Sequence, residues 1–436
     1  MNIAVCGTGY VGLVAAVAFG AMGHHVVGID TDENKIATLN SGRSPLFEPD
    51  LENLMKKHAQ NLSFTTDVVE GYAEADIIFI AVPTPEDADG RANLDYVKVA
   101  CNHIAASGTT ADFVVIKSTV PPGTNIEIQN IFDTITPEGK RFEVISNPEF
   151  LSQGTAVRDM MKPSRIVVGV QSEEAASLCR KLYAPFDAKL FEMDLCSAEM
   201  VKYASNDFLA LKISYINEIA NLCDMLGANV EEVAAAMGAD PRIGSAFLKA
   251  GIGYGGSCFP KDTKALHWLS SCRGKEIKTI KAAIDVNKTQ RMILLEKAHS
   301  HHESFSGMSI AVLGLSFKPG TDDLREAPSL EIVKSLLEEG ANLHLYDPYA
   351  ANSFKSSYPE SSKVSYAASA QEALKHSEMV FLLTEWPEIS SLCPYDFTHN
   401  MTRVEIYDGR NIFPLDYFDG FSVRYESIGR PAYDML

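Results

Sequence analysis

The amino-acid sequence predicts an α/β protein: two doubly wound domains joined by a helical middle domain with a long central helix. Short apolar segments alternate with helical segments at both ends of the chain, which is typical of parallel sheets covered by helices. The two ends also share strand and turn patterns, and the segment between them has helical periodicity. We place the domains at residues 1–193, 194–300 and 301–436.

Length and composition indicate a folded protein of several domains. The chain has 436 residues, of which 46% are hydrophobic and 22% are charged. Its net charge of −19 argues against nucleic acid or anionic membranes as partners, so a polyanionic ligand needs a local cluster of Lys and Arg. No apolar run reaches the ~18 residues that span a bilayer, and the N-terminus has no signal-peptide pattern. We therefore expect a cytoplasmic protein without membrane insertion.

The eight cysteines are scattered, and none belongs to a CxxC motif or to a spacing typical of zinc sites. This pattern predicts no metal site and a reduced, cytoplasmic environment. Only Cys258 stands out by its surroundings. For the other seven we expect a buried structural role.

Buried strands of the first domain are short apolar runs, most of them near-continuous, as expected for strands covered on both faces. We expect these strands at residues 3–6, 25–30, 76–82, 112–117, 142–146 and 165–170. A helix at 11–22, rich in small residues, follows the first strand. The alternation predicts a doubly wound sheet.

A GxGxxG motif, Gly7-Thr8-Gly9-Tyr10-Val11-Gly12, links the first strand to this helix. Such glycines permit a tight turn, close approach of a pyrophosphate and close helix–strand packing, and the helix N-terminus faces the phosphates. Asp30, which ends the second strand, suits a ribose hydroxyl and would repel a 2′-phosphate. The combination predicts a Rossmann-like domain that binds NAD⁺ rather than NADP⁺. The alternative is a glycine-rich turn without a ligand.

From residue 194 to about 227, apolar side chains recur at helical intervals without proline or internal glycine. A helix of this length either bridges two domains or packs against a copy of itself. Lys202 and Asn206 lie one turn apart on it, on a face that is either functional or solvated. Further helical segments follow to about residue 300.

Near residue 307 the α/β pattern begins again. The segment 310–314 matches 3–7, and a strand at 342–346 ends at Asp347 as the earlier strand ends at Asp30. This second Rossmann-like domain lacks GxGxxG. Its cations Lys318, Arg325 and Arg410 are either ordinary surface residues or the cluster that holds a phosphorylated ligand.

Residues 251–262 place Cys258 in a glycine-rich segment, which allows a ligand to approach the backbone closely. Pro260 predicts that a helix begins there, and Lys261 lies close by in sequence. Both features favour a reactive thiolate. Two other segments, 117–123 and 147–151, follow strands at the sheet edge where α/β proteins bind ligands, and Glu149 is a candidate general base.

Together these motifs resemble the UDP-glucose/GDP-mannose dehydrogenase family over essentially the whole chain. The resemblance is carried by residues 7–12, 117–121, 147–151, 198–206, 253–262 and 317–325. It implies a four-electron oxidation at C6 of a nucleotide sugar, from alcohol to acid, with two NAD⁺ consumed. UDP-glucose is the favoured substrate. The alternatives are GDP-mannose, a UDP-N-acetylhexosamine, or a non-catalytic sensor of NAD or nucleotide sugars.

The resemblance also implies residue roles. Cys258 is the nucleophile that captures the aldehyde, Lys202 and Asn206 stabilise the oxyanion, and Glu149, Thr119 and Asp262 manage protons and water. The implied cofactor contacts are Gly7, Gly9, Tyr10, Val11, Gly12, Asp30, Lys35, Thr84, Thr119, Gln153 and Arg325. The implied substrate contacts are Glu149, Phe150, Leu151, Lys202, Asn206, Arg242, Phe247, Leu248, Lys249, Gly255, Phe317, Lys318 and Arg410.

Arg242 matches a family arginine that reaches the partner subunit's site, which implies a homodimer through the central helix. Two positions depart from the family pattern. Gln153 stands where many relatives have Glu, and Pro83 removes a backbone N–H on the nicotinamide side.

Overall fold

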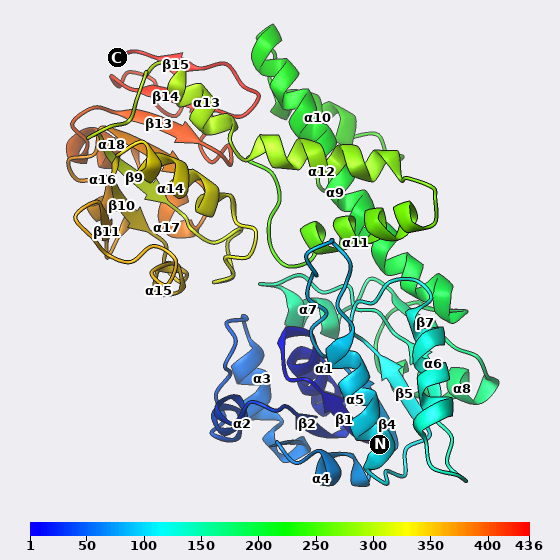
Figure 1. Cartoon of the computed structure of the whole chain (residues 1–436). Coiled ribbons are helices and arrows are strands. Elements are labelled where there is room, and N and C mark those ends of the chain that lie inside the picture. Colours follow the sequence, from blue (N-terminus) through cyan, green and yellow to red (C-terminus); the bar gives the residue numbers. More distant parts are fainter. The chain divides into compact units, whose positions relative to one another are not determined.

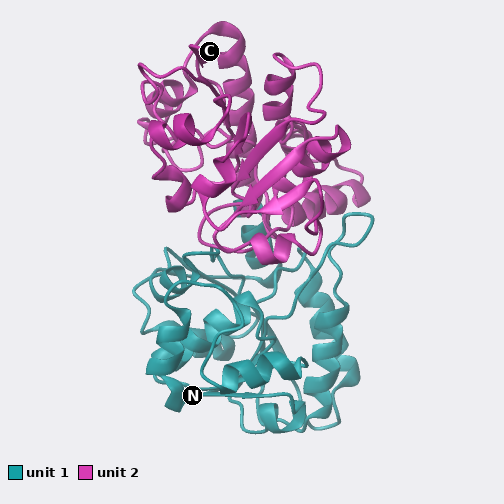
Figure 2. Cartoon of the chain, turned by 90° about the vertical axis from the view of Figure 1, so that its left-hand side faces the viewer, with its two compact units in different colours: residues 1–205 teal, residues 206–436 magenta.

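The computed structural model describes all 436 residues. They form two compact units, residues 1–205 and 206–436 (Figure 2). Each unit contains one mostly parallel sheet, and the division falls within the long helix α9 (Leu195–Leu226). The predicted fold class, with two Rossmann-like sheets and a long helix, is confirmed.

The first sheet has eight strands in the order β3-β2-β1-β4-β5-β6-β7-β8 (Figure 1). Its strands are β1 (Asn2–Cys6), β2 (His25–Ile29), β3 (Leu62–Thr65), β4 (Ile77–Ile80), β5 (Phe113–Ile116), β6 (Glu143–Ser146), β7 (Ile166–Gly169) and β8 (Leu190–Met193). All neighbours are parallel except β6 and β7. The sequence pattern missed β3 and β8 because both are edge strands of half-buried or exposed residues, without a continuous apolar run.

Helices cover both faces of this sheet. They are α1 (Tyr10–Ala21), α2 (Glu33–Asn40), α3 (Leu51–Lys57), the 3₁₀ turn η1 (Ala59–Asn61), α4 (Val68–Ala73), α5 (Asp95–Ala106), α6 (Thr124–Ile135), α7 (Ala156–Met161) and α8 (Glu173–Tyr183). Alternate residues of β1 enter opposite cores: Ile3 and Val5 pack with α1, and Ala4 packs with α5. A strand with two apolar faces is therefore buried on both sides, as its sequence predicts.

The glycine motif joins β1 to α1 as predicted. Gly7 adopts a left-handed backbone with φ of 93°, and its amide donates to the carbonyl of Ile29 at 2.8 Å. A Cβ on Gly12 would stand 1.9 Å from the Gly7 carbonyl oxygen, so only glycine lets α1 approach the turn this closely.

The second sheet has seven strands in the order β11-β10-β9-β12-β13-β14-β15. They are β9 (Ser309–Leu313), β10 (Asn342–Tyr346), β11 (Val364–Tyr366), β12 (Met379–Leu382), β13 (Glu405–Asp408), β14 (Arg424–Ser427) and β15 (Tyr433–Asp434). Only the last pair is antiparallel. The first six strands repeat the order of β3-β2-β1-β4-β5-β6, which agrees with the internal similarity seen in the sequence.

The remaining helices belong to the second unit. They are α10 (Val230–Gly238), α11 (Phe259–Cys272), α12 (Lys278–Gln290), α13 (Ile293–His299), α14 (Pro328–Glu338), α15 (Ala351–Phe354), α16 (Ala370–Leu374), α17 (Pro387–Ser390) and α18 (Pro394–Asn400). Ile216 and Ala220 of α9 share one apolar core with Leu294 of α13 and with Ile310 and Val312 of β9. The helical segment and the second sheet are thus packed together. No helix has the length and apolar character needed to cross a membrane.

We expect Gly12→Ala to lower the free energy of unfolding by about 1–3 kcal/mol, because the added methyl group overpacks the turn. Gly9→Ala is the matched control, since a Cβ at Gly9 would meet nothing within 4 Å. Chemical denaturation followed by circular dichroism compares the two. Equal unfolding free energies would show that the close approach of α1 is not required.

Candidate active site

Asp30 lies directly after β2 and binds the glycine motif. Its Oδ2 accepts hydrogen bonds from the Thr8 amide at 2.9 Å and the Thr8 hydroxyl at 2.8 Å, and pairs with Lys35 Nζ at 2.7 Å. Burial raises the pKa of Asp30, but the hydrogen bonds from Lys35 and Thr8 outweigh burial and hold the pKa below its ordinary value. Asp30 is therefore ionised at neutral pH, and it orients Lys35.

The N-terminus of α1 fits a dinucleotide. No side chain caps this end of the helix, and a Cβ on Gly9 would project into open space. Unpaired amides at a helix N-terminus attract phosphate, and a carboxylate at the end of the second strand suits a ribose. The side chain of Tyr10 extends from this end of the helix to Gly154, whose amide donates a hydrogen bond to the Tyr10 hydroxyl at 3.1 Å.

Thr84 and Thr119 follow the neighbouring strands β4 and β5. The Thr84 hydroxyl donates to the Thr119 carbonyl at 2.8 Å, so the two loops are joined at the carboxyl edge of the sheet. This edge is where the sequence places cofactor and substrate contacts.

A buried ion pair joins Lys202 of α9 to Glu149 of the loop after β6. Lys202 Nζ lies 2.9 Å from Glu149 Oε1, and the two side chains are only 4% and 5% exposed. The second oxygen of Glu149 accepts a hydrogen bond from the Leu151 amide. The solvated alternative for Lys202 is therefore wrong. Each partner compensates the charge of the other, which is the condition for burying either one.

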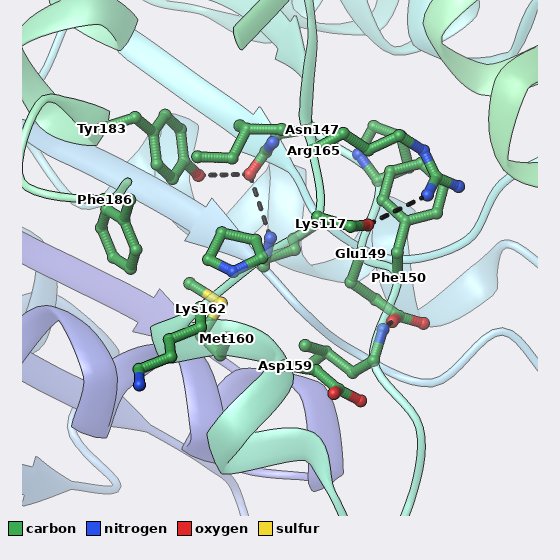
Figure 3. Close-up of a pocket in the computed structure, with 15 residues that line it drawn as sticks. Lys117, Asn147, Glu149, Phe150, Asp159, Met160, Lys162, Arg165, Tyr183 and Phe186 are labelled. Atoms are coloured by element: carbon green, nitrogen blue, oxygen red, sulfur yellow. Dashed lines mark hydrogen bonds between the residues drawn. The ribbon is translucent and has the colours of Figure 1, made fainter. Parts of the chain in front are cut away.

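Glu149 also lines a cavity of about 240 Å³ in the first unit (Figure 3). Lys117 points into it from the end of β5, and its Nζ donates to Asn147 Oδ1 at 3.0 Å. Burial lowers the pKa of Lys117 to about 8, with Glu149 opposing and Lys202 adding to this shift. The guanidinium of Arg165 stacks on the Phe150 ring at 4.0 Å. Sequence reasoning did not single out Lys117 or Arg165.

Cys258 is the N-cap residue of α11, and it is exposed. Helix α11 begins at Phe259 with Pro260 in its first turn, as predicted. The glycine segment before it packs on the loop before α14: a Cβ on Gly255 would lie 2.3 Å from the Glu326 carbonyl oxygen. The Gly256 amide donates to the Arg325 carbonyl at 2.8 Å.

Lys261, the cation expected near Cys258, is bound to a carboxylate: its Nζ pairs with Asp262 Oδ1 at 2.7 Å. The charge of Arg325 interacts with the Cys258 thiol: the pKa of Arg325 is raised by Asp323 first, and Cys258 adds to the shift. Sequence reasoning placed Arg325 among the cofactor contacts and did not connect it with the thiol.

Asp262 and Asn206 are brought together in the second unit. Asn206 Nδ2 donates to Asp262 Oδ2 at 2.7 Å, and both residues are buried. The solvated alternative is therefore wrong for Asn206 too. Asp262 thus receives an amide N–H on one oxygen and an ammonium on the other, which stabilises its ionised form.

Arg410 ties the cysteine segment to two loops of the second sheet. Its guanidinium donates to the carbonyls of Leu383 at 2.9 Å, Gly253 at 3.2 Å and Phe317 at 3.0 Å. Burial lowers its pKa. Arg410 is thus no ordinary surface cation.

The other predicted contacts are more exposed. The Arg242 side chain is 87% exposed and pairs with Asp240 at 2.6 Å, and the Arg325 side chain is 64% exposed. Phe247 is 40% exposed with its ring edge-on to Phe259, whereas Leu248 is buried. Val11, Leu151, Gln153, Phe317 and Lys318 are half-buried, and Lys249 is exposed.

The expectation that the other seven cysteines are buried is wrong for Cys272 and Cys393, which are exposed, and Cys6 and Cys196 are half-buried. Cys272 ends α11 and Cys393 is the N-cap residue of α18, and residue type alone does not dictate burial at such positions. No cysteine forms a disulfide.

Two glutamates that the sequence did not indicate position the site loops. Glu48 accepts hydrogen bonds from the amides of Gly154 at 2.7 Å and Ala156 at 2.6 Å, which flank the Gln153 loop. Glu199 accepts from Gly123 and Asn125, both at 2.6 Å, and so holds the start of α6. Burial raises the pKa of Glu199 to about 7 against these hydrogen bonds. Glu48 lies in no motif, and Glu199 lies in the segment 198–206 that carries the family resemblance but was assigned no role there.

Comparison with known proteins assigns all three parts of the chain to one family. Residues 1–187 match the NAD binding domain, 196–289 the central domain and 311–414 the UDP binding domain of the UDP-glucose/GDP-mannose dehydrogenase family.

Individual relatives are similar over their full length. The UDP-glucose 6-dehydrogenases YwqF and TuaD of Bacillus subtilis (strain 168) are 46% and 43% identical, covering 99% of this chain and 98% and 94% of their own. A UDP-glucose dehydrogenase structure from Pyrobaculum islandicum has a TM-score of 0.91 at 37% identity, covering 99% of this chain and 98% of that chain.

We expect Lys202→Met to lower the free energy of unfolding by about 3–5 kcal/mol, because it leaves the buried Glu149 carboxylate without its partner. Lys202→Met combined with Glu149→Gln removes both charges and should recover most of the loss. Urea denaturation of the two variants measures the difference. A double variant no more stable than the single one would contradict the paired-charge account.

Proposed function

The chain belongs to the UDP-glucose/GDP-mannose dehydrogenase family, and on this premise we propose that it oxidises UDP-glucose to UDP-glucuronate with two NAD⁺. The observation that carries this conclusion is full-length identity of up to 46% to enzymes named for that reaction. The side chains that the reaction needs are present: a nucleophile in Cys258, and two buried polar pairs, Lys202–Glu149 and Asn206–Asp262.

The first unit holds the cofactor. The α1 N-terminus would bind the pyrophosphate, Asp30 the adenosine ribose, and the loops of Thr84 and Thr119 would lie toward the nicotinamide. Lys35, Val11, Gln153 and Arg325 are further proposed contacts. When bound, NAD⁺ supplies the hydride acceptor for both oxidations.

Lys202 is proposed to stabilise the negative charge on the C6 oxygen while the alcohol loses its proton and is oxidised to the aldehyde. An ammonium already held by Glu149 is fixed in place, so little reorganisation is needed as charge develops on the substrate. Glu149 and Thr119 are the candidates for passing on the alcohol proton. Phe150 and Leu151, which follow Glu149, are proposed to contact the sugar.

Cys258 is proposed to capture the aldehyde. Its thiolate adds to the C6 carbonyl carbon, and the oxygen gains a proton to form a thiohemiacetal. Oxidation of this adduct gives a thioester, and one water hydrolyses it to the acid with release of the thiol. Covalent capture therefore keeps the aldehyde in place for its second oxidation. Asn206 is proposed to stabilise the oxyanion of the adduct.

Asp262 is proposed to accept the proton of the hydrolytic water. Its carboxyl group is positioned by Lys261 and Asn206, which both donate to it at 2.7 Å. The second unit is proposed to bind the UDP portion through Phe317, Lys318 and Arg410, with Phe247, Leu248, Lys249 and Gly255 near the sugar. A cytoplasmic location is part of the proposal, supported by eight cysteines without a disulfide.

With limiting UDP-glucose and excess NAD⁺, we expect two NADH per sugar, measured by absorbance and by chromatography of the product. Cys258→Ser should lose acid formation by about 10³-fold or more while retaining binding of both ligands, because a hydroxyl is a poor nucleophile at neutral pH. Cys393→Ser, at another exposed cysteine, is the control.

Other outcomes separate the alternatives. One NADH per sugar, or near-normal acid formation by Cys258→Ser, would overturn the covalent mechanism. NADH only with GDP-mannose or a UDP-N-acetylhexosamine would replace the substrate. No NADH with any of these sugars would favour a non-catalytic sensor.

We also propose that the protein is a homodimer through α9. Phe208, Tyr215 and Leu222 are spaced by seven residues, so they share one helix face, and they are 60%, 48% and 51% exposed. Met225 and Leu226 extend this face at 80% and 79% exposed. An apolar face of this kind is typical of a helix that packs against another. Arg242, exposed in the same unit, is proposed to reach the partner subunit.

We expect Tyr215→Glu combined with Leu222→Glu to give a monomer, because two charges on this face cannot be buried against a second copy. Val99→Glu, at an exposed apolar residue of α5 that is 50% exposed, is the matched control. Analytical ultracentrifugation measures the mass. A wild-type monomer, or a double variant that remains dimeric, would contradict the assignment.

A further inference from the structure

Asp207 is a buried carboxyl group with no hydrogen-bond partner. It follows Asn206 on α9, is only 2% exposed, and neither of its side-chain oxygens has a hydrogen-bond partner. An ionised carboxylate in such a place carries a large desolvation cost, whereas a protonated carboxyl carries a much smaller one. The burial and the lack of partners therefore favour the neutral acid.

The charged neighbour of Asp207 is Asp262 of α11. Burial is the larger cause that raises the pKa of Asp207. The negative charge of Asp262 raises it further, and together they bring it to about 8. Asp262 itself receives Lys261 Nζ and Asn206 Nδ2, both at 2.7 Å. Of two neighbouring carboxyl groups, the one that receives a cation and a donor holds a negative charge more easily, so the proton stays on the other, Asp207.

The other titratable groups around Asp207 do not change this assignment. The Tyr254 phenol, before α11, interacts with Asp207, is hydrogen bonded to Thr263 and Ser214, and stays neutral because burial raises its pKa to about 12. Arg291, the C-cap residue of α12, interacts with Tyr254, but its guanidinium is bound to Glu326 at 2.9 Å and Glu331 at 2.6 Å. Neither supplies Asp207 with a compensating cation.

We propose that Asp207 is a positioning residue for the reaction: a neutral carboxyl beside Asp262 that keeps Asp262 the single ionised carboxylate of this cluster. The inference rests on the proposed function, in which Asp262 accepts the proton of the hydrolytic water. While Asp207 is neutral, Asp262 stays in its hydrogen bond to Asn206. When Asp207 loses its proton, two negative charges lie together in a buried cluster, and their repulsion displaces Asp262.

The test compares Asp207→Asn, which mimics the neutral acid, with the wild-type enzyme across pH 6 to 9.5. Wild-type kcat should fall above a pKa near 8, and the ratio of Asp207→Asn to wild type should be about tenfold larger at pH 9 than at pH 7, following the neutral fraction of Asp207. Glu276→Gln, an exposed carboxyl between α11 and α12, is the control and should keep the wild-type profile.

Two readouts do not depend on activity. At pH 7 the infrared difference spectra of wild type minus Asp207→Asn and of wild type minus Asp207→Ala should show the carbonyl band of a protonated carboxyl, because the band of Glu199, whose pKa is about 7, is common to all three proteins and cancels. Because the folded pKa is raised, the stability that Asp207 contributes is fully present below its unfolded pKa of about 3.9 and is lost as pH rises toward 8. The Tm of Asp207→Asn should therefore exceed that of wild type by a margin that widens from pH 5 to 8.

Absence of the carboxyl band from both difference spectra, or a Tm difference that does not vary with pH, would overturn the neutral state. If the band is present but the kcat of Asp207→Asn still falls above pH 8 as in wild type, the positioning role would be overturned. If Asp207→Asn does not fold, the wild-type band is instead compared with Asp207→Ala. Its presence and its change with pH then decide whether Asp207 is neutral. Failure of the proposed function is recognised separately, by wild type producing no NADH from UDP-glucose at pH 7.

Discussion

The burial of charged side chains along α9 is the constraint on which the candidate site depends. Lys202 is compensated by Glu149, and Glu199 by two backbone amides at the start of α6. The Lys202–Glu149 pair holds the loop after β6, and the hydrogen bonds to Glu199 hold the loop after β5. Because a buried charge is costly when its partner is removed, displacing either loop carries a free-energy penalty.

Each of the two α/β parts has an aspartate directly after the equivalent strand, but the two aspartates bind different partners. Asp30 after β2 binds Thr8 of its glycine turn and Lys35. Asp347 after β10 accepts hydrogen bonds from Leu315 and Ser316 amides and from Trp386 Nε1 at 2.8, 3.0 and 3.1 Å. Asp347 is buried with its partners inside the chain, so it is not available to a ribose. The second sheet thus keeps the strand order of the first, with a turn that lacks GxGxxG and an acid that is bound within the chain.

The sequence predicted most strongly what depends on local pattern. Strands buried on both faces, the glycine turn and the start of α11 at Phe259 all follow from residues adjacent in the chain, and the structure has them. The edge strands β3 and β8 have half-polar sequences and were missed. The pairing of Lys261 with Asp262 was not predicted, because local spacing does not show which carboxylate an ammonium meets. Glu48 and Asp207 were missed because their meaning comes from burial and from partners far away in sequence.

Arg410 illustrates how the structure refines a role that a motif can only suggest. A guanidinium has five N–H donors, and Arg410 directs donors from all three nitrogens to the carbonyls of Leu383, Gly253 and Phe317. Gly253 belongs to the cysteine segment and Phe317 to the loop that carries Lys318. A single buried cation therefore sets the distance between the nucleophile's segment and the loop proposed to bind UDP. Its effect on a ligand would come first through these two loops, so replacing it by lysine, which lacks the planar fork, would change both at once.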